Sequence, residues 1–329
     1  MVTRGCEQTV YACCTWLTLR HGRAANFSAI HAVRAAATLG LALLVQLLDG
    51  PASAVDARHP LSGAEVTGTP PATGNSPIVV PLRLRRHFPL IVAKIDGLDV
   101  PLVFDSGDQS TVALHRSVLD AIRAVPTDES ERLQFSKGPT VESAKFRIRR
   151  LQIGQAVFTD IIGRLDSHDP SYQATDVGQK GFLGTGLLKP YELVLDYRKR
   201  RMTLIPRGGD ERPSLSCRGT DVPFASLKEP AEPVTEITTD LGAFLAWWDT
   251  GTPTSVITKR FVDKAQPKQF KDRLTTRRLV LGRRDFGPWR FEVWDATLPP
   301  WFEGLIGYDF FVNHTVCMDF PDRRVVVVR

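Results

Sequence analysis

Short apolar runs, each bounded by Gly, Asp or Pro, dominate the sequence from about residue 78 onward. They are rich in Val, Ile, Leu and Phe, a composition that predicts β-strands. The clearest runs are LIVAKI (90–95), VPLVF (100–104), KFRIRRLQI (145–153) and ELVLDY (192–197). Helical spacing of apolar residues is found in HRSVLDAIRAV (115–125), and a second short helix is expected in SVITKRFVDKA (255–265). The pattern therefore predicts a chain that is mostly β.

The same pattern of landmarks occurs twice along the chain, which is the signature of an internal repeat. Three pairs of segments align in the same order: PLVFDSGDQSTVAL (101–114) with LAWWDTGTPTSVI (245–257), LQIG (151–154) with LVLG (279–282), and FLGTGLLKPYELVLDYRKRRMTL (182–204) with LIGYDFFVNHTVCMDFPDRRVVV (305–327). Val-Pro before each set adds a fourth landmark. We therefore expect one β-rich unit, duplicated, with a junction after Pro206.

Each unit contains an apolar run that ends in Asp-Ser/Thr-Gly, at residues 105–107 and 249–251. One such tripeptide is weak evidence, since it occurs in many turns. Two copies at matching places would face each other across a pseudo-twofold axis. Carboxylates about 3 Å apart cannot both ionise, so Asp105 and Asp249 would share one proton. Such a pair can take a proton from water and donate one to a carbonyl oxygen.

The other residues of the two tripeptides support this arrangement. Gly107 and Gly251 carry no Cβ, so the backbone can approach the carboxylates and point N–H groups at them. Ser106 and Thr250 offer hydroxyls that can form hydrogen bonds across the interface. The motif predicts two turns that hold each other rigid.

These residues resemble the aspartic proteases of the pepsin and retropepsin type, and the bacterial retropepsin-like aspartyl protease domain. The resemblance rests on FDSG…FLG and WDTG…LIG and covers most of residues 78–329. It implies an all-β, two-lobed acid-protease β-barrel fold made of two homologous lobes with a cleft between them. It also implies that Gly184 and Gly307 brace the catalytic turns, and that the protein is an aspartic endopeptidase without metal or organic cofactor. Because both units lie in one chain, as in pepsin, a monomer that acts on peptide or protein substrates is expected.

The two units differ in the interval after the tripeptide. Asp105 to Gly154 spans 49 residues, whereas Asp249 to Gly282 spans 33. In the family this interval holds a hairpin flap that covers the substrate. The resemblance therefore implies a single flap in the first lobe, which includes Ser136, Lys137 and Gly138. The alternative is a plain surface loop.

The first tripeptide is followed by Asp108, whereas the second is followed by Thr252. A third carboxylate beside the pair would disturb the shared proton, unless it points to solvent. Our hypothesis is that Asp108 is tolerated and shifts the pH profile. A catalytically inactive peptide-binding module of the same fold is the alternative function. Glycoside hydrolysis by two carboxylates is a third, which the duplicated turns favour little.

The N-terminal region predicts export. AAATLGLALLVQLL (35–48) is uncharged, follows Arg34 and precedes an Ala-x-Ala site at residues 52–54. This is the pattern of a secretory signal peptide cleaved after Ala54. The apolar run is shorter than the roughly 20 residues of a membrane span, so an N-terminal anchor is the less favoured interpretation. The long segment before it allows a start codon further downstream, and a secreted or periplasmic location is expected.

The composition adds limits. With 43% hydrophobic residues, general disorder is excluded, and the formal charge of +6 is spread along the chain, so no nucleic-acid partner and no stable membrane insertion are expected. The histidines lack metal-ligand spacing, and no metal site is predicted. Cleavage after Ala54 would leave Cys217 and Cys317, which form either a disulfide or two unrelated thiols.

The expected organisation is set by these boundaries. It comprises a signal peptide (1–54), a flexible linker rich in Pro, Gly, Ser and Thr (55–77), an N-terminal lobe (78–206), an inter-lobe junction (207–221) and a C-terminal lobe (222–329).

Overall fold

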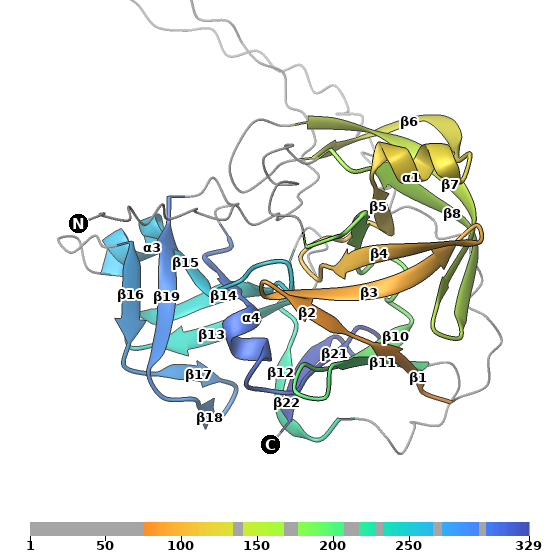
Figure 1. Ribbon diagram of the computed structural model, residues 1–329. Coiled ribbons are helices and arrows are strands. Elements are labelled where there is room, and N and C mark those ends of the chain that lie inside the picture. Colours follow the sequence, from red (N-terminus) through yellow and green to blue (C-terminus); the bar gives the residue numbers. More distant parts are fainter. Residues whose placement is uncertain are drawn as a thin grey trace, which may run out of the picture. The chain divides into compact units, whose positions relative to one another are not determined.

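Three β-sheets make up almost all of the regular structure in the computed structural model (Figure 1). The structure describes residues 76–133, 141–167, 177–206, 217–227, 233–265, 272–295 and 301–328. The predicted signal peptide and nearly all of the linker lie outside the described residues, as do Ser136, Lys137 and Gly138 of the predicted flap. None of the described helices is long and apolar enough to cross a membrane. The prediction of a two-lobed, all-β fold is confirmed.

The first lobe is an eight-stranded sheet in the order β2-β3-β4-β9-β5-β8-β7-β6. Its strands are β2 (Arg83–Arg85), β3 (Phe88–Ile95), β4 (Leu98–Phe104), β5 (Val112–Leu114), β6 (Val125–Leu133), β7 (Val141–Ile153), β8 (Ala156–Leu165) and β9 (Gly181–Leu183). The predicted first helix is present as α1 (Arg116–Ala121). Strands β4 and β9 are parallel neighbours, with Val103 opposite Phe182.

The second lobe repeats this plan in the order β16-β19-β15-β20-β14-β13-β17-β18. Its strands are β13 (Val234–Thr239), β14 (Gly242–Trp248), β15 (Val256–Thr258), β16 (Arg273–Thr276), β17 (Leu279–Leu281), β18 (Arg284–Asp285), β19 (Trp289–Trp294) and β20 (Gly304–Ile306). The central order β13-β14-β20-β15-β19 matches β3-β4-β9-β5-β8 strand for strand. Parallel β14 and β20 correspond to β4 and β9.

The second predicted helix begins later than the sequence pattern suggests. Residues 256–258 form β15, and α3 (Lys259–Ala265) starts only after it. The buried residues Val256 and Ile257 are β-branched, which favours a strand, and they pair with β19 and β20. Tertiary pairing therefore overrides the local helical pattern at this point.

A third, six-stranded sheet is shared by the two lobes, in the order β1-β11-β10-β21-β22-β12. Its strands are β1 (Ile78–Pro81), β10 (Tyr191–Asp196), β11 (Arg201–Pro206), β12 (Gly219–Pro223), β21 (Val316–Asp319) and β22 (Arg324–Val328). Antiparallel pairing of β10 with β21 joins the lobes, with Leu193 opposite Met318. Strand β12 spans the predicted boundary between the junction and the second lobe.

Cys217 and Cys317 form a disulfide in this sheet, with 6.4 Å between their Cα atoms. The structure thus decides between the two alternatives that the sequence leaves open. The disulfide links β21 to the segment that leads into β12.

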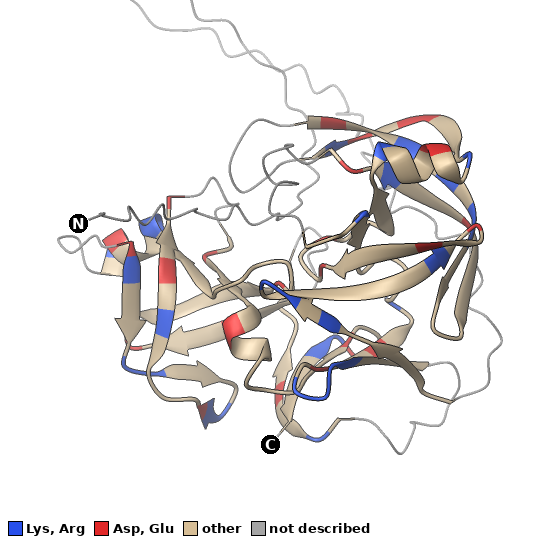
Figure 2. Ribbon diagram, viewed as in Figure 1, with Lys and Arg blue, Asp and Glu red and all other residues tan. Residues whose placement is uncertain are grey.

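The turn between β10 and β11 carries three exposed basic residues, Arg198, Lys199 and Arg200. Figure 2 shows Lys and Arg on this turn and on the nearby β2–β3 hairpin. The turn contacts the residue between β1 and β2, because the Leu82 N–H donates to the Arg200 carbonyl oxygen (2.8 Å).

Candidate active site

The two predicted aspartates occupy equivalent places in the two lobes. Asp105 directly follows β4 and Asp249 directly follows β14, and both are fully buried. The Asp105 N–H donates to the Leu183 carbonyl oxygen and the Asp249 N–H to that of Ile306, each over 2.9 Å. The parallel strands β9 and β20 therefore hold both turns at the same register.

A reciprocal set of buried hydrogen bonds locks the first turn (residues 105–108) to the second turn (residues 249–252). The Ser106 N–H donates to Thr250 Oγ1 (2.9 Å), and the Thr250 N–H donates to Ser106 Oγ (3.0 Å). Each hydroxyl then donates to a carbonyl of the other lobe, Ser106 to Trp248 (2.6 Å) and Thr250 to Phe104 (2.7 Å). All four bonds cross between the lobes, so neither turn can move without the other.

Each glycine of the tripeptides faces the carboxyl group of the opposite lobe. A Cβ on Gly107 would lie 2.8 Å from Asp249 Cγ, and one on Gly251 would lie 2.5 Å from Asp105 Oδ2. Any side chain there would overlap the carboxyl group. The Gly107 N–H donates to Asp105 Oδ1 (2.8 Å) and the Gly251 N–H to Asp249 Oδ1 (2.7 Å), so the backbone fixes the orientation of both carboxyls.

The electrostatics of Asp105 reflect this confinement. The pKa of Asp105 is raised well above its ordinary value, and burial is the largest cause. The charges of Asp249 and Asp108 raise this pKa further. A side-chain hydrogen bond with Asp249 acts in the same direction, whereas the Gly107 N–H lowers the pKa. Asp105 is therefore coupled to Asp249 and holds its proton more tightly than an isolated aspartate does.

Gly184 and Gly307, the predicted bracing residues, lie directly after β9 and β20. The Gly184 N–H donates to the Thr111 carbonyl oxygen (3.2 Å), and the Gly307 N–H to Ser255 Oγ (3.3 Å). A Cβ on Gly184 would overlap the Ser110 carbonyl oxygen. The structure thus brings both glycines against the loops that continue from the two turns.

Asp108 does not point to solvent. It is 1% exposed, and its Oδ2 lies 2.8 Å from Nη2 of Arg164, which is equally buried. Arg164 could not be predicted from the sequence, because its partner lies 56 residues away and no motif marks it.

Aromatic residues surround the second turn. Both Trp247 and Trp248 are fully buried. The indole N–H of Trp247 donates to the Ser106 carbonyl oxygen (3.2 Å), so this ring also crosses between the lobes. Trp248 donates to Thr235 Oγ1 (2.9 Å).

Tyr197, from the first lobe, packs against the segment after Gly307. Its ring stacks on Phe311 and lies near Tyr308, with centroids 5.7 Å apart in each case. Burial raises the pKa of Tyr197 well above its ordinary value, and the charges of Tyr308, Asp249 and Asp105 add to this.

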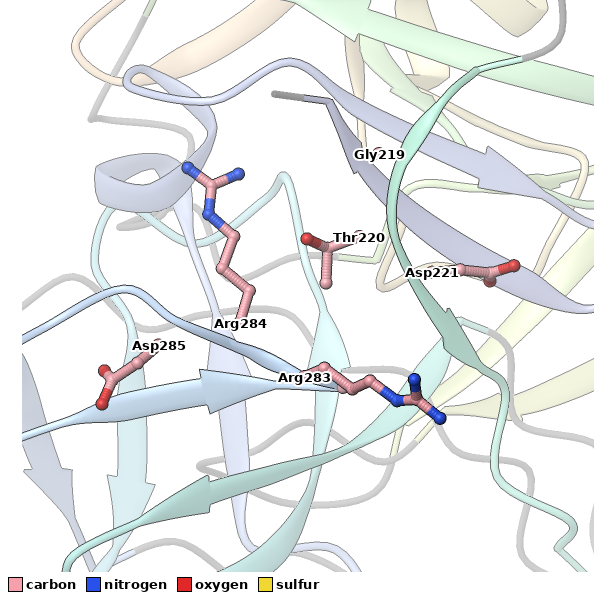
Figure 3. A pocket seen from close by; sticks show the side chains of 7 residues that line it. Gly219, Thr220, Asp221, Arg283, Arg284 and Asp285 are labelled. Atoms are coloured by element: carbon pink, nitrogen blue, oxygen red, sulfur yellow. The ribbon is translucent and has the colours of Figure 1, made fainter.

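Two other places in the described part of the chain gather polar groups. Glu192, Cys217 and Cys317 have the donor atoms of a metal site, but both sulfurs are engaged in the disulfide. A pocket of about 870 Å³ lies between β12 and the β17–β18 hairpin. Figure 3 shows Arg283 and Arg284 pointing in different directions there, so the pocket has no convergent set of ligand-binding groups.

Comparison with known proteins adds one firm result. No protein-family model and no curated protein matches the sequence. Among solved structures, the chain is similar to the crystal structure of an aspartic proteinase from Irpex lacteus, with a TM-score of 0.53 and 12% identity; the match covers 77% of this chain and 97% of that one. At this identity the likeness shows the fold alone. The chain has the two-lobed β fold of the pepsin-like aspartic proteinases.

Proposed function

We propose that the protein is an aspartic endopeptidase, and that Asp105 and Asp249 hydrolyse peptide bonds by activating a water molecule. The observation that carries this proposal is the reciprocal packing of the two turns, in which each glycine faces the opposite carboxyl. A purely structural turn needs neither two buried, coupled carboxyls nor their reciprocal pairing across two lobes. Buried titratable groups with strongly shifted pKa values are typical of active sites.

The chemistry depends on one proton held between two carboxyls. The ionised member accepts a proton from water as the water oxygen attacks the peptide carbonyl carbon, while the protonated member donates to the carbonyl oxygen. A tetrahedral diol forms. In its collapse the C–N bond breaks as the nitrogen takes a proton from the pair, and a diol hydroxyl gives its proton to the pair as the C=O bond of the new carboxyl group forms. The pair therefore ends with one proton, as it began.

The remaining residues have positioning roles in this proposal. Ser106 and Thr250 hold the turns together, Gly107 and Gly251 give the carboxyls room, and Gly184 and Gly307 brace the loops. Ser136, Lys137 and Gly138 remain proposed residues of the flap. Because one chain supplies both aspartates, we propose a monomer that acts on peptide or protein substrates after export to the periplasm or the medium.

Peptide hydrolysis at acidic pH tests the proposal directly. The full chain is incubated with a mixture of unstructured peptides between pH 3 and 7, and the products are identified by mass spectrometry. We expect cleavage by the parent and a loss of at least about 10³-fold in Asp249→Asn. Asp120→Asn, an exposed carboxylate on α1, is the matched control and should leave the rate unchanged.

The same assay decides between the proposal and its alternative. A parent protein that binds peptides without cleaving any of them would establish an inactive peptide-binding module. Equal rates for the parent and Asp249→Asn would show that another group is responsible for cleavage.

A further inference from the structure

The first turn continues into a buried ion pair that has no counterpart in the second turn. Asp108 and Arg164 are each 1% exposed at the side chain, with Oδ2 and Nη2 2.8 Å apart. The other carboxylate oxygen, Oδ1, accepts the Ser110 N–H (2.8 Å). Both oxygens of Asp108 are thus engaged by groups other than Asp105, although Asp108 is only three residues away from it.

Arg164 reaches Asp108 from the interior of the first lobe. It lies on β8, where it is opposite Ala113 of β5 and Lys145 of β7. The Asp108 carbonyl oxygen accepts the N–H (2.8 Å) and the hydroxyl (3.2 Å) of Thr185, the residue after Gly184. The ion pair is therefore built into the same loops that position Asp105. Desolvation of two buried charges is costly, and the loss of either partner leaves the other uncompensated.

Several neighbouring elements supply charged groups around this pair. Asp105 and Asp249 lie on the turn side, Glu131 comes from β6 and Lys145 from β7. Burial raises the pKa of Glu131, which also responds to the charges of Arg164, Asp108 and Lys145. The Asp108 charge is also among the influences that raise the pKa of Asp105. Arg164 is thus the buried cation in a group of four carboxyls.

We propose that Arg164 is a positioning residue of the Asp105–Asp249 pair, which engages the Asp108 carboxylate in an ion pair so that the shared proton stays between Asp105 and Asp249. This inference rests on the proposed function for its catalytic meaning. Its physical content, the distribution of protons among the carboxyls, can be measured whether or not the protein cleaves peptides.

Substitutions of the two partners should move the titration of the Asp105–Asp249 pair in opposite directions. Asp108→Asn removes a negative charge and keeps the Arg164 cation, so the upper midpoint of the pair should fall by about one pH unit. Arg164→Met removes the cation, so the carboxyls should bind protons more tightly and the midpoint should rise by about as much. The double variant removes both charges and should return the midpoint toward that of the parent.

Carbon-13 NMR of the full chain, labelled at the aspartate carboxyl carbons, reads these midpoints. Asp105→Asn and Asp249→Asn assign the resonances, and the pH profile of peptide cleavage is recorded in parallel. Arg164→Lys keeps the charge and should restore a midpoint near the parent value. Asp160→Asn with Arg147→Met removes an exposed ion pair between β7 and β8, and should leave the midpoint unchanged.

Opposite shifts that cancel in the double variant would support the proposal. Shifts in the same direction, or an unchanged midpoint in Asp108→Asn, would overturn it. If Arg164→Met does not fold, Asp108→Asn and the double variant still decide. If the variants show these shifts but the parent cleaves no peptide, the proposed function is refuted and the role of Arg164 stands.

Discussion

The first and second turns use the same hydrogen bonds to hold their aspartates and differ in the residue after the glycine. In both, a buried strand ends at the aspartate, and the hydroxyl of the next residue donates to the other lobe. In the first turn the fourth residue is Asp108, paired with Arg164. In the second turn it is Thr252, whose hydroxyl donates weakly to the Thr254 carbonyl oxygen (3.4 Å).

The two turns therefore share the contacts that hold the paired carboxyls and differ in the residue that follows each glycine. The contacts between the lobes are reciprocal, because each turn is the other's support. The residue after each glycine finds its partner within its own lobe: Asp108 pairs with Arg164, and the Thr252 hydroxyl donates to the Thr254 carbonyl oxygen. The duplication therefore preserves the carboxyl pair while its two surroundings diverge.

The largest effect is expected from substitution of Gly107 and Gly251, which tests the contacts that the two turns share. Gly251→Ala would place a Cβ 2.5 Å from Asp105 Oδ2, and Gly107→Ala would place one 2.8 Å from Asp249 Cγ. Displacement of a carboxyl by about 1 Å should lower kcat by about 10²-fold or more, with Gly251→Ala the more severe. Gly287→Ala, where nothing lies within 4 Å of an added Cβ, should lose stability only. Equal rates for Gly251→Ala and the parent would contradict the close approach.

Removal of the disulfide tests the sheet that both lobes share. Cys217 and Cys317 are separated by 100 residues in the sequence. Replacement of both by Ser should lower the free energy of unfolding by about 4 kcal/mol, because the cross-link restricts a long loop of the unfolded chain. Urea denaturation of the oxidised parent and the double variant measures this. A parent whose stability is insensitive to reducing agent would argue against the disulfide.

The hydroxyls that lock the turns should be equivalent in the two lobes. Ser106→Ala and Thr250→Val each remove buried hydrogen bonds and leave polar backbone groups without partners, so each should cost about 3 kcal/mol. The double variant should cost clearly less than the sum, because the two hydroxyls belong to one network. Additive losses in urea denaturation would show that the two turns are supported independently.

The smallest expected effect is the change with pH in the free energy of unfolding, and the shifted pKa of Asp105 fixes its direction. The folded-state pKa of Asp105 is raised above its ordinary value of 3.8, so its contribution to stability is present below pH 3.8 and is lost as the pH rises. Asp105→Asn should therefore match the parent near pH 3 and exceed its stability at pH 7 by at least about 1 kcal/mol. Asp120→Asn should follow the parent at both pH values. A parent whose stability relative to Asp105→Asn rises with pH would contradict the shift.

Much of the fold can be predicted from local patterns in the sequence. Alternating short apolar runs predict the strands, and the order of four landmarks predicts the duplication that the matching central strands display. The relation of Ser106 to Thr250 could also be predicted, because pseudo-symmetry places two equivalent motifs opposite each other. In contrast, Arg164 and Tyr197 contact partners that are distant in the sequence, and Arg164 belongs to no motif. The strand at residues 256–258 depends on pairing with β19 and β20, which no local pattern encodes.

Neutron diffraction from a crystal of the full chain near pH 5 would show the shared proton itself, because it locates the exchangeable hydrogens on the carboxyl groups. We expect oxygens of Asp105 and Asp249 to lie within hydrogen-bonding distance, about 3 Å, and the pair to hold a single deuteron. Carboxyls separated by a wider gap, or a deuteron count of zero or two, would contradict a pair that shares one proton.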